Sequence, residues 1–344
     1  MTAVANRPGA SDQVVPPSPS LSRPHALMRD RYDVVVVGSG YGGAIAAARL
    51  ARAGRSVCVL ERGRELRAGD FPTTLLGALR QVQVRRGRGR LGRRGGLFDL
   101  RPGDDLSVLV GCGLGGTSLI NAGVSLRPPD WVFDDERWPK ALRGDQGRAE
   151  LAPWFEEAER MLGARPYPAD GGRWPSLPKF RALQRSAQGV ARAVGAEGDG
   201  APVVEAVPIN VSFEDGPNAV GVEQRACVLC GDCVTGCNHR AKNTLVENYL
   251  PDAVAHGAEL YCEAAVQLVE PVEGADGDRP RWRVTFEAVG DGRTRFRAPT
   301  SFVFADVVVL AAGSLGSTEI LLRSRERGLA VSPRLGDRFT GNGD

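Results

Sequence analysis

Three glycines and one glutamate in the amino-terminal part of the chain have the spacing that binds a dinucleotide. Gly38, Gly40 and Gly43 form the pattern G-x-G-x-x-G, and Glu61 follows 18 residues after the last glycine. In this pattern the first glycine permits a tight turn, the second lets backbone approach a pyrophosphate, and the third lets a helix pack closely on a sheet. A carboxylate at the position of Glu61 can accept hydrogen bonds from a ribose. The pattern alone leaves NAD, NADP and FAD open.

The residues around these positions predict the elements that hold them. Residues 34–37 are four valines and indicate a buried strand, small residues at 44–53 indicate a helix, and residues 57–60 indicate a second buried strand. The free N–H groups at the start of the helix would face the phosphates. The order is that of a dinucleotide-binding βαβ unit. Its predicted turn comprises Gly38, Ser39, Gly40, Tyr41, Gly42 and Gly43.

A second glycine-rich segment spans residues 111–123 and reads GCGLGGTSLINAG. So many glycines in a short stretch let backbone run against a flat ligand. Thr117 and Asn121 add side chains that can form hydrogen bonds. The apolar residues before and inside the segment indicate an ordered, buried loop.

A third element spans residues 302–323. It reads as a buried strand, a turn of small residues that includes Ala312 and Gly313, and a helix. This is the pattern of a later strand in a dinucleotide-binding sheet, whose turn and helix start also point toward the ligand.

Four cysteines in the second half of the chain have a spacing typical of metal ligands. Cys227, Cys230, Cys233 and Cys237 follow C-x2-C-x2-C-x3-C, the bacterial ferredoxin pattern except that Asn238 replaces the usual proline. Closely spaced thiolates can hold an iron–sulfur cluster, and four sulfurs can also hold zinc. A turn of buried thiols without metal is the third interpretation. The sequence leaves all three open, with an iron–sulfur cluster as the candidate second cofactor.

The glycine-rich segments together resemble the glucose–methanol–choline family of flavin oxidoreductases, and most of all its cholesterol-oxidase-like branch. VVVVGSGYGGAIAAARL resembles the family's FAD fingerprint, and GCGLGGTSLINAG resembles its flavin-contacting loop. Residues 241–260 and 306–324 resemble the stretch leading to its second signature. The resemblance covers residues 30 to 344. It implies FAD, a three-layer Rossmann-like α/β domain with a second, substrate-binding domain, and oxidation of an alcohol to a carbonyl.

The resemblance also implies roles for particular residues. The ADP part of FAD would contact the fingerprint glycines and Glu61, the flavin would lie along the second glycine cluster, and the adenine would meet the backbone of Val266. The complete set of implied FAD contacts is Gly38, Ser39, Gly40, Tyr41, Gly42, Gly43, Glu61, Gly113, Gly115, Gly116, Thr117, Asn121, Val266, Ala312 and Gly313.

The catalytic residues stay unassigned. Family members place a catalytic histidine and a partnering asparagine or histidine near the carboxyl terminus, at a position that we expect to lie beyond Asp344. The three histidines of this chain, His25, His239 and His256, do not match that position. The resemblance therefore implies an amino-terminal portion of an enzyme, with a downstream polypeptide as the expected partner that completes the fold. A non-catalytic FAD-binding fragment and an electron-transfer flavoprotein with an iron–sulfur cluster stay open as alternatives.

Length and composition fit an enzyme that acts on a small molecule. The net charge of +3 over 344 residues is too small to imply nucleic acid, and no run of 18 apolar residues predicts a transmembrane helix. We expect a cytoplasmic protein whose substrate is a bulky apolar alcohol such as a sterol. The segment 85–96 carries six arginines and five glycines. It is read as a solvated mobile loop, with an anionic membrane surface or acidic partner as the alternative ligand.

The expected organisation has four parts. Residues 1–28, rich in Pro, Ser and Ala, form a disordered tail. Residues 29–126 begin the FAD-binding domain, and residues 127–224 belong to the substrate domain and its connections. Residues 225–344 return to the FAD-binding domain and include the cysteine run.

Overall fold

The structure, a computed structural model, describes residues 19–87, 89–169, 171–195, 204–274, 280–290, 300–337 and 339–340. The chain divides into two compact units, one made of Met1–Asn121 and Glu214–Asp344 and the other of Ala122–Phe213. The smaller unit thus begins and ends earlier than the 127–224 segment that we expected to face the substrate.

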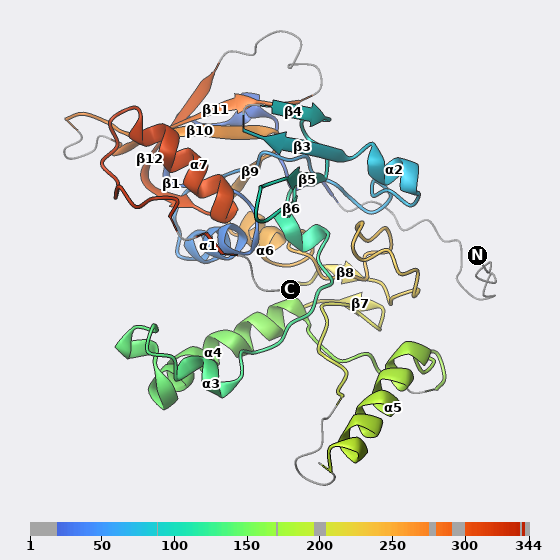
Figure 1. Ribbon diagram of the computed structural model, residues 1–344. Coiled ribbons are helices and arrows are strands. Elements are labelled where there is room, and N and C mark those ends of the chain that lie inside the picture. Colours follow the sequence, from blue (N-terminus) through green and yellow to red (C-terminus); the bar gives the residue numbers. More distant parts are fainter. Residues whose placement is uncertain are drawn as a thin grey trace. The chain divides into compact units, whose positions relative to one another are not determined.

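Parallel strands form the centre of the larger unit, as the valine-rich segments predict (Figure 1). Strand β1 (Arg31–Val37) pairs with β12 (Ser301–Leu310) on one side and with β2 (Val57–Leu60) on the other. Strand β9 (Glu259–Tyr261) extends the sheet beyond β2. Parallel strands that are buried on both faces read as continuous apolar runs, which explains the valines of β1. The predicted Rossmann-like α/β fold is confirmed.

Two antiparallel strands complete this sheet beside β12. Strand β11 (Trp282–Ala288) pairs with β12, and β10 (Ala264–Pro271) pairs with β11. Helix α7 (Gly313–Arg325) packs against β10. The Ser324 hydroxyl fixes this contact by accepting a 2.9 Å hydrogen bond from the Val269 amide.

Two further helices of the larger unit pack on each other. Helix α1 (Tyr41–Arg52) connects β1 to β2, and α6 (Tyr249–Ala255) precedes β9. Arg52 binds Asp252 through two hydrogen bonds of 2.6 and 2.8 Å. The predicted helix at residues 44–53 therefore begins at Tyr41, directly after the glycine turn, and its first N–H groups face that turn.

A second, smaller sheet has the strand order β4-β3-β5-β6. Strands β3 (Val82–Arg86) and β4 (Gly89–Gly92) form an antiparallel hairpin, so the expectation of a mobile loop at residues 85–96 is wrong. Gly92 has φ +86°, and a Cβ there would lie 2.3 Å from the carbonyl oxygen of Val82. Gly92 therefore serves strand packing rather than flexibility. The remaining elements of this region are α2 (Leu75–Leu79), β5 (Phe98–Arg101), β6 (Val108–Gly111), β7 (Gly216–Pro217) and β8 (Glu223–Gln224).

The smaller unit is helical in its described part. Its helices are α3 (Asp130–Phe133), α4 (Gly144–Leu162) and α5 (Pro178–Ala193). Helix α4 ends at Gly163, whose φ of +58° gives the left-handed cap that glycine favours. The buried Trp174 ring lies 5.0 Å from that of Phe213, between ring centroids. No helix in the described residues of either unit has the length and apolar character needed to cross a membrane.

Part of the expected disordered tail is ordered. Residues 1–18 lie outside the described residues, but residues 19–28 form defined contacts with the larger unit. The Glu65 carboxylate accepts hydrogen bonds from the backbone amides of Leu21 and Ser22, at 2.8 and 3.0 Å. The side chain of His25 lies 2.7 Å from the carbonyl oxygen of Cys262. A carboxylate far along the chain thus fixes a segment whose composition alone indicates disorder.

Candidate functional site

Segments far apart in the sequence meet at one cavity of about 310 Å³ in the larger unit. The turns after β1 and β12 and the residue after β2 all reach it, at the carboxyl ends of parallel strands where such sheets bind ligands. The predicted residues in its wall are Gly38, Ser39, Gly40, Tyr41, Gly42, Glu61, Gly116, Thr117, Val266, Ala312 and Gly313. The predicted residues Gly43, Gly113, Gly115 and Asn121 lie outside that wall.

The fingerprint glycines have different physical roles. Gly38 has φ +94°, and a Cβ there would lie 2.5 Å from the carbonyl oxygen of Ala311. A Cβ on Gly43 would lie 2.0 Å from the carbonyl oxygen of Gly38, so this glycine sets the distance between helix α1 and strand β1. A Cβ on Gly40 would meet no atom within 4 Å, and Gly40 lines the cavity. Gly40 therefore leaves room for a ligand, whereas the other two permit packing.

The start of helix α1 offers hydrogen-bond donors to the cavity. Gly40 is its N-cap residue and has no side chain to accept from the first N–H groups. Unsatisfied N–H groups and the positive end of the helix dipole together favour an anion. This is the arrangement that binds the phosphates of a dinucleotide.

Glu61 is a fixed acceptor in the wall. Its side chain is 7% exposed and accepts hydrogen bonds from the Ser39 hydroxyl at 2.6 Å, the Ser39 amide at 3.1 Å and the Gly63 amide at 2.7 Å. The Ser39 hydroxyl in turn accepts a 2.9 Å bond from the amide of Gly115. Ser39 therefore joins the fingerprint turn to the second glycine cluster, a link that spacing along the sequence does not reveal.

The second glycine cluster packs on the fingerprint turn. Gly115 has φ +100°, and a Cβ on Gly116 would lie 3.0 Å from the Cα of Gly40. The Asn121 amide donates a 2.9 Å bond to the Tyr41 hydroxyl, while its Oδ1 is buried without a partner among the described residues. Burial raises the pKa of Tyr41, so this phenol is neutral at physiological pH. The close backbone approach places Gly116 beside Gly40 in the cavity wall.

An arginine group that sequence reasoning missed surrounds one buried carboxylate. Asp99, on β5, is 0% exposed and binds Arg85 at 2.6 Å and Arg62 at 2.7 Å, with Arg101 at 3.3 Å. Desolvation acts to lower the pKa of Arg62, but Cys112, Asp99 and Glu61 raise it. All three arginines line the cavity. The only signal in the sequence is the density of arginines, which does not specify their shared partner.

Replacing Asp99 with asparagine should destabilise the protein by on the order of 3–5 kcal/mol, because it leaves buried guanidinium groups without their counter-charge. Urea unfolding measures this free energy. Asp306→Asn is the matched control, since Asp306 pairs with Arg31 at the surface and its loss should cost at most about 1 kcal/mol. Equal losses in the two variants would contradict the structural role of Asp99.

The sulfurs of the four cysteines do not converge in this structure. Within the described ranges, no three Cys, His, Asp or Glu side chains gather where they could hold a metal ion. Backbone amides donate to two of the sulfurs, from Leu229 to Cys227 at 3.3 Å and from Lys242 to Cys237 at 3.5 Å. Burial raises the pKa of Cys227. Metal binding by this run therefore stays a prediction.

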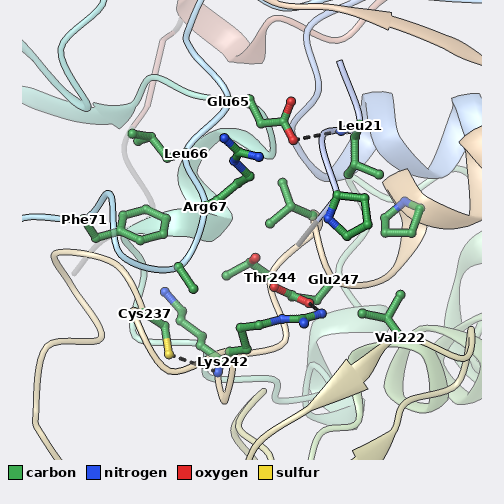
Figure 2. Close-up of a pocket in the computed structure, with 15 residues that line it drawn as sticks. Leu21, Glu65, Leu66, Arg67, Phe71, Val222, Cys237, Lys242, Thr244 and Glu247 are labelled. Atoms are coloured by element: carbon green, nitrogen blue, oxygen red, sulfur yellow. Dashed lines mark hydrogen bonds and ion pairs between the residues drawn. The ribbon is translucent and has the colours of Figure 1, made fainter. Parts of the chain in front are cut away.

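Lys242 holds the cysteine segment against the second glycine cluster. Its ammonium group donates to the carbonyl oxygens of Asn121, Cys233 and Leu119, at 2.6, 3.0 and 3.2 Å. Burial lowers the pKa of Lys242 to about 8. Figure 2 shows Lys242 beside Cys237 at a second, largely apolar cavity of about 180 Å³. Lys242 therefore links the cysteine segment to the second glycine cluster.

The histidines lie away from the larger cavity. None of the residues that line it in the described part of the chain is a histidine. His25 contacts the Cys262 carbonyl, and the ring of His256 lies 2.8 Å from the carbonyl oxygen of Asp252. The structure thus gives neither of these residues contact with a ligand in the cavity.

Comparison with known proteins gives a consistent set of similarities. A family model described as GMC oxidoreductase matches residues 32–340. A cholesterol oxidase of Acinetobacter baumannii is 32% identical over 324 residues, which are 91% of this chain and 54% of that protein. A cholesterol oxidase of Mycobacterium tuberculosis is 32% identical over 326 residues, 90% of this chain and 51% of that protein. The chain therefore spans about half the length of these curated relatives.

Two more distant similarities accompany them. A long-chain-alcohol oxidase of Arabidopsis thaliana is 28% identical over 302 residues, 87% of this chain and 35% of that protein. A solved structure of Aspergillus oryzae formate oxidase has a TM-score of 0.48 and 18% identity, and the match covers 86% of this chain and 48% of that one. Similarity at this last level supports no conclusion about function.

Proposed function

Because the chain belongs to the GMC oxidoreductase family, we propose that it takes part in the FAD-dependent oxidation of the CH–OH group of a bulky apolar alcohol. GMC oxidoreductases bind FAD and act on CH–OH donors. Sterols are the first candidate substrates, since two relatives at 32% identity are cholesterol oxidases. The observation that carries the proposal is the cavity built jointly by the fingerprint turn, the second glycine cluster and the turn after β12.

The residues of this cavity fit FAD in a definite order. Gly40 and the start of α1 would hold the diphosphate, and Glu61 would accept hydrogen bonds from the ribose. Val266 lines the wall on β10 and would meet the adenine, while Gly116 and Thr117 would lie beside the flavin. When bound, FAD supplies the hydride acceptor for alcohol oxidation. The protein's part is to bind this group, orient it and exclude water from it.

Alcohol oxidation also needs an acceptor for the hydroxyl proton. No histidine lines the cavity within the described residues. We therefore assign the proton acceptor to no residue of the described cavity wall, and propose a longer chain or a second polypeptide as its source. The relatives, about twice as long as the matched region, have room for such a group.

The test separates FAD binding from turnover. The chain of 344 residues should bind FAD stoichiometrically, seen as a flavin band at about 450 nm that stays with the protein through gel filtration. Absence of FAD binding would overturn the proposed function. Under anaerobic conditions, sterols and long-chain alcohols should bleach the band more readily than short polar alcohols do. Preference for short polar alcohols would overturn the substrate class.

Bleaching by the chain alone should be slow, because a missing general base costs ~10²–10⁴-fold in rate. Added imidazole should accelerate it by replacing the absent acceptor. Rapid bleaching without imidazole would place the base within these residues, and His239 would then be the first position to substitute.

A further inference from the structure

The β3–β4 hairpin contributes positive charge to the wall of the larger cavity. Arg85 on β3, Arg90 on β4 and Arg94 just after β4 all line it. They come from the segment 85–96, for which the sequence predicted a solvated loop, or alternatively a patch that binds an anionic membrane surface or an acidic partner. The complete set of arginines in the wall is Arg62, Arg85, Arg90, Arg94, Arg101 and Arg323.

Arg90 differs from the other five in its contacts. Arg62, Arg85 and Arg101 share Asp99, and Arg101 also binds Glu319 at 2.6 Å. The two others are also paired: Arg94 binds Glu287 at 2.8 Å, and Arg323 donates to the Gln267 carbonyl at 2.9 Å. The backbone of Arg90 pairs with that of Arg85 in the hairpin, but its side chain makes no ion pair or hydrogen bond with any residue in the described ranges. A guanidinium with five N–H donors is thus left open at the cavity.

The electrostatic surroundings of Arg90 favour a bound anion. Arg90 lies exposed on β4, but partial desolvation, followed by the neighbouring positive charges of Arg94, Arg85 and Arg62, lowers its pKa, while the charge of Glu287 acts to raise it. The six arginines of the wall lie among four carboxylates, those of Glu61, Asp99, Glu287 and Glu319. The arginines that line the wall outnumber the carboxylates that line it, Glu61 and Glu319. The negative charges of a dinucleotide's diphosphate would offset part of this positive charge.

The alternative ligands of this hairpin fit less well. Arg86, on the same hairpin, is 68% exposed and pairs with Asp104, as a solvated surface arginine does. A membrane surface would need several guanidinium groups free and directed outward. Instead, Arg85 and Arg94 are held by carboxylates in and beside the cavity. Among the described hairpin arginines that line the cavity, Arg90 is the one whose side chain has no ion-pair partner.

We propose that Arg90 is an anion-binding residue of the dinucleotide site and donates hydrogen bonds to the phosphate oxygens of the bound cofactor. The proposal rests on the proposed binding of FAD and adds a residue outside the glycine fingerprint. Charge-assisted hydrogen bonds to phosphate are stronger than neutral ones, and arginine matches phosphate geometry with two parallel donors. The β3–β4 hairpin is then part of the cofactor-binding site.

The test compares Arg90→Gln with Arg86→Gln, the same change on the same hairpin outside the cavity wall. The affinity of the protein freed of FAD is measured for FAD by fluorescence titration, and for ADP and adenosine by competition with FAD. Arg90→Gln should weaken FAD and ADP on the order of 10-fold or more and leave adenosine unchanged, since adenosine has no phosphate. Arg86→Gln should change none of the three. Arg90→Lys should recover part of the lost affinity for FAD and ADP. Added salt should reduce the difference in FAD affinity between Arg90→Gln and the wild type.

Each contrary result has a distinct meaning. FAD binding by Arg90→Gln that equals wild type overturns this proposal alone, whereas wild-type protein that binds no FAD overturns the proposed function. An equal loss of adenosine binding overturns the phosphate assignment, because it would place Arg90 at the nucleoside. Unfolding curves of the two glutamine variants should coincide, and a fall confined to Arg90→Gln would assign Arg90 to stability instead.

Discussion

Replacement of Gly40 by valine should abolish FAD binding while the protein stays folded. A Cβ on Gly40 meets no protein atom within 4 Å, so the valine side chain projects into the cavity that would hold the diphosphate. The backbone of Gly40, with φ −63° and ψ −174°, is accessible to any residue, so valine adds no strain. The affinity for FAD should fall on the order of 100-fold or more, since each ~1.4 kcal/mol of lost contact costs tenfold.

Fluorescence titration with FAD measures this loss, and circular dichroism checks the fold. Gly189→Val is the matched control, because Gly189 lies in the exposed helix α5 and also has open space around its Cβ position. That variant should bind FAD as the wild type does. Unchanged FAD affinity in Gly40→Val would show that the diphosphate does not lie at the start of α1.

Replacement of Gly43 by alanine should cost about 3 kcal/mol or more of stability, the second large effect that we expect. The added Cβ would lie 2.0 Å from the carbonyl oxygen of Gly38 and 3.2 Å from the Cβ of Ala311. The Gly38 carbonyl is backbone and the Ala311 Cβ is fixed directly to backbone, so neither can yield without moving α1 away from the sheet. The buried alanines of α1 would then lose their close packing as the helix moves.

Gly42, the neighbouring glycine of the same helix, provides a control for which we expect no loss of stability. Gly42 has no atom within 4 Å of its Cβ position, so Gly42→Ala should be neutral or stabilising by up to about 1 kcal/mol, through helix propensity. Urea unfolding without added FAD compares the two variants. Equal changes in the free energy of unfolding for Gly42→Ala and Gly43→Ala would show that helix propensity, and not the contact between α1 and β1, determines the effect of alanine at these positions.

The contrast between these glycines shows what the pattern G-x-G-x-x-G predicts and what it leaves out. The spacing alone predicts the strand, the turn and the helix, because φ preference and close packing are local demands on single residues. The structure then separates the roles, with Gly43 at the sheet and Gly40 at the cavity. The apolar runs of β1 and β2 likewise predict their burial without any knowledge of their neighbours.

The cysteine run and the arginine segment show the opposite case. The spacing of the four cysteines predicts metal binding, and the composition of the arginine segment predicts a solvated patch of positive charge. The structure leaves the four sulfurs unassembled among the described residues and turns Arg85, Arg90 and Arg94 to the cavity. Spacing along a chain limits which atoms can meet, but it does not decide which partner each side chain finds.

The amino-acid sequence by itself thus determined the βαβ fingerprint and a dinucleotide as the class of cofactor, because these depend on short-range patterns of glycine and apolar residues. The family and FAD followed from the resemblance of several segments taken together. Tertiary structure alone decided which charges are satisfied. Asp99 gathers arginines from β3, β5 and the end of β2, and Glu65 fixes residues 19–28. Lys242 ties the cysteine segment to the second glycine cluster through backbone carbonyls. The physical reason is that a buried charge needs a counter-charge or a hydrogen-bond acceptor beside it. The chain fold decides which residue lies there, and separation along the sequence does not predict it.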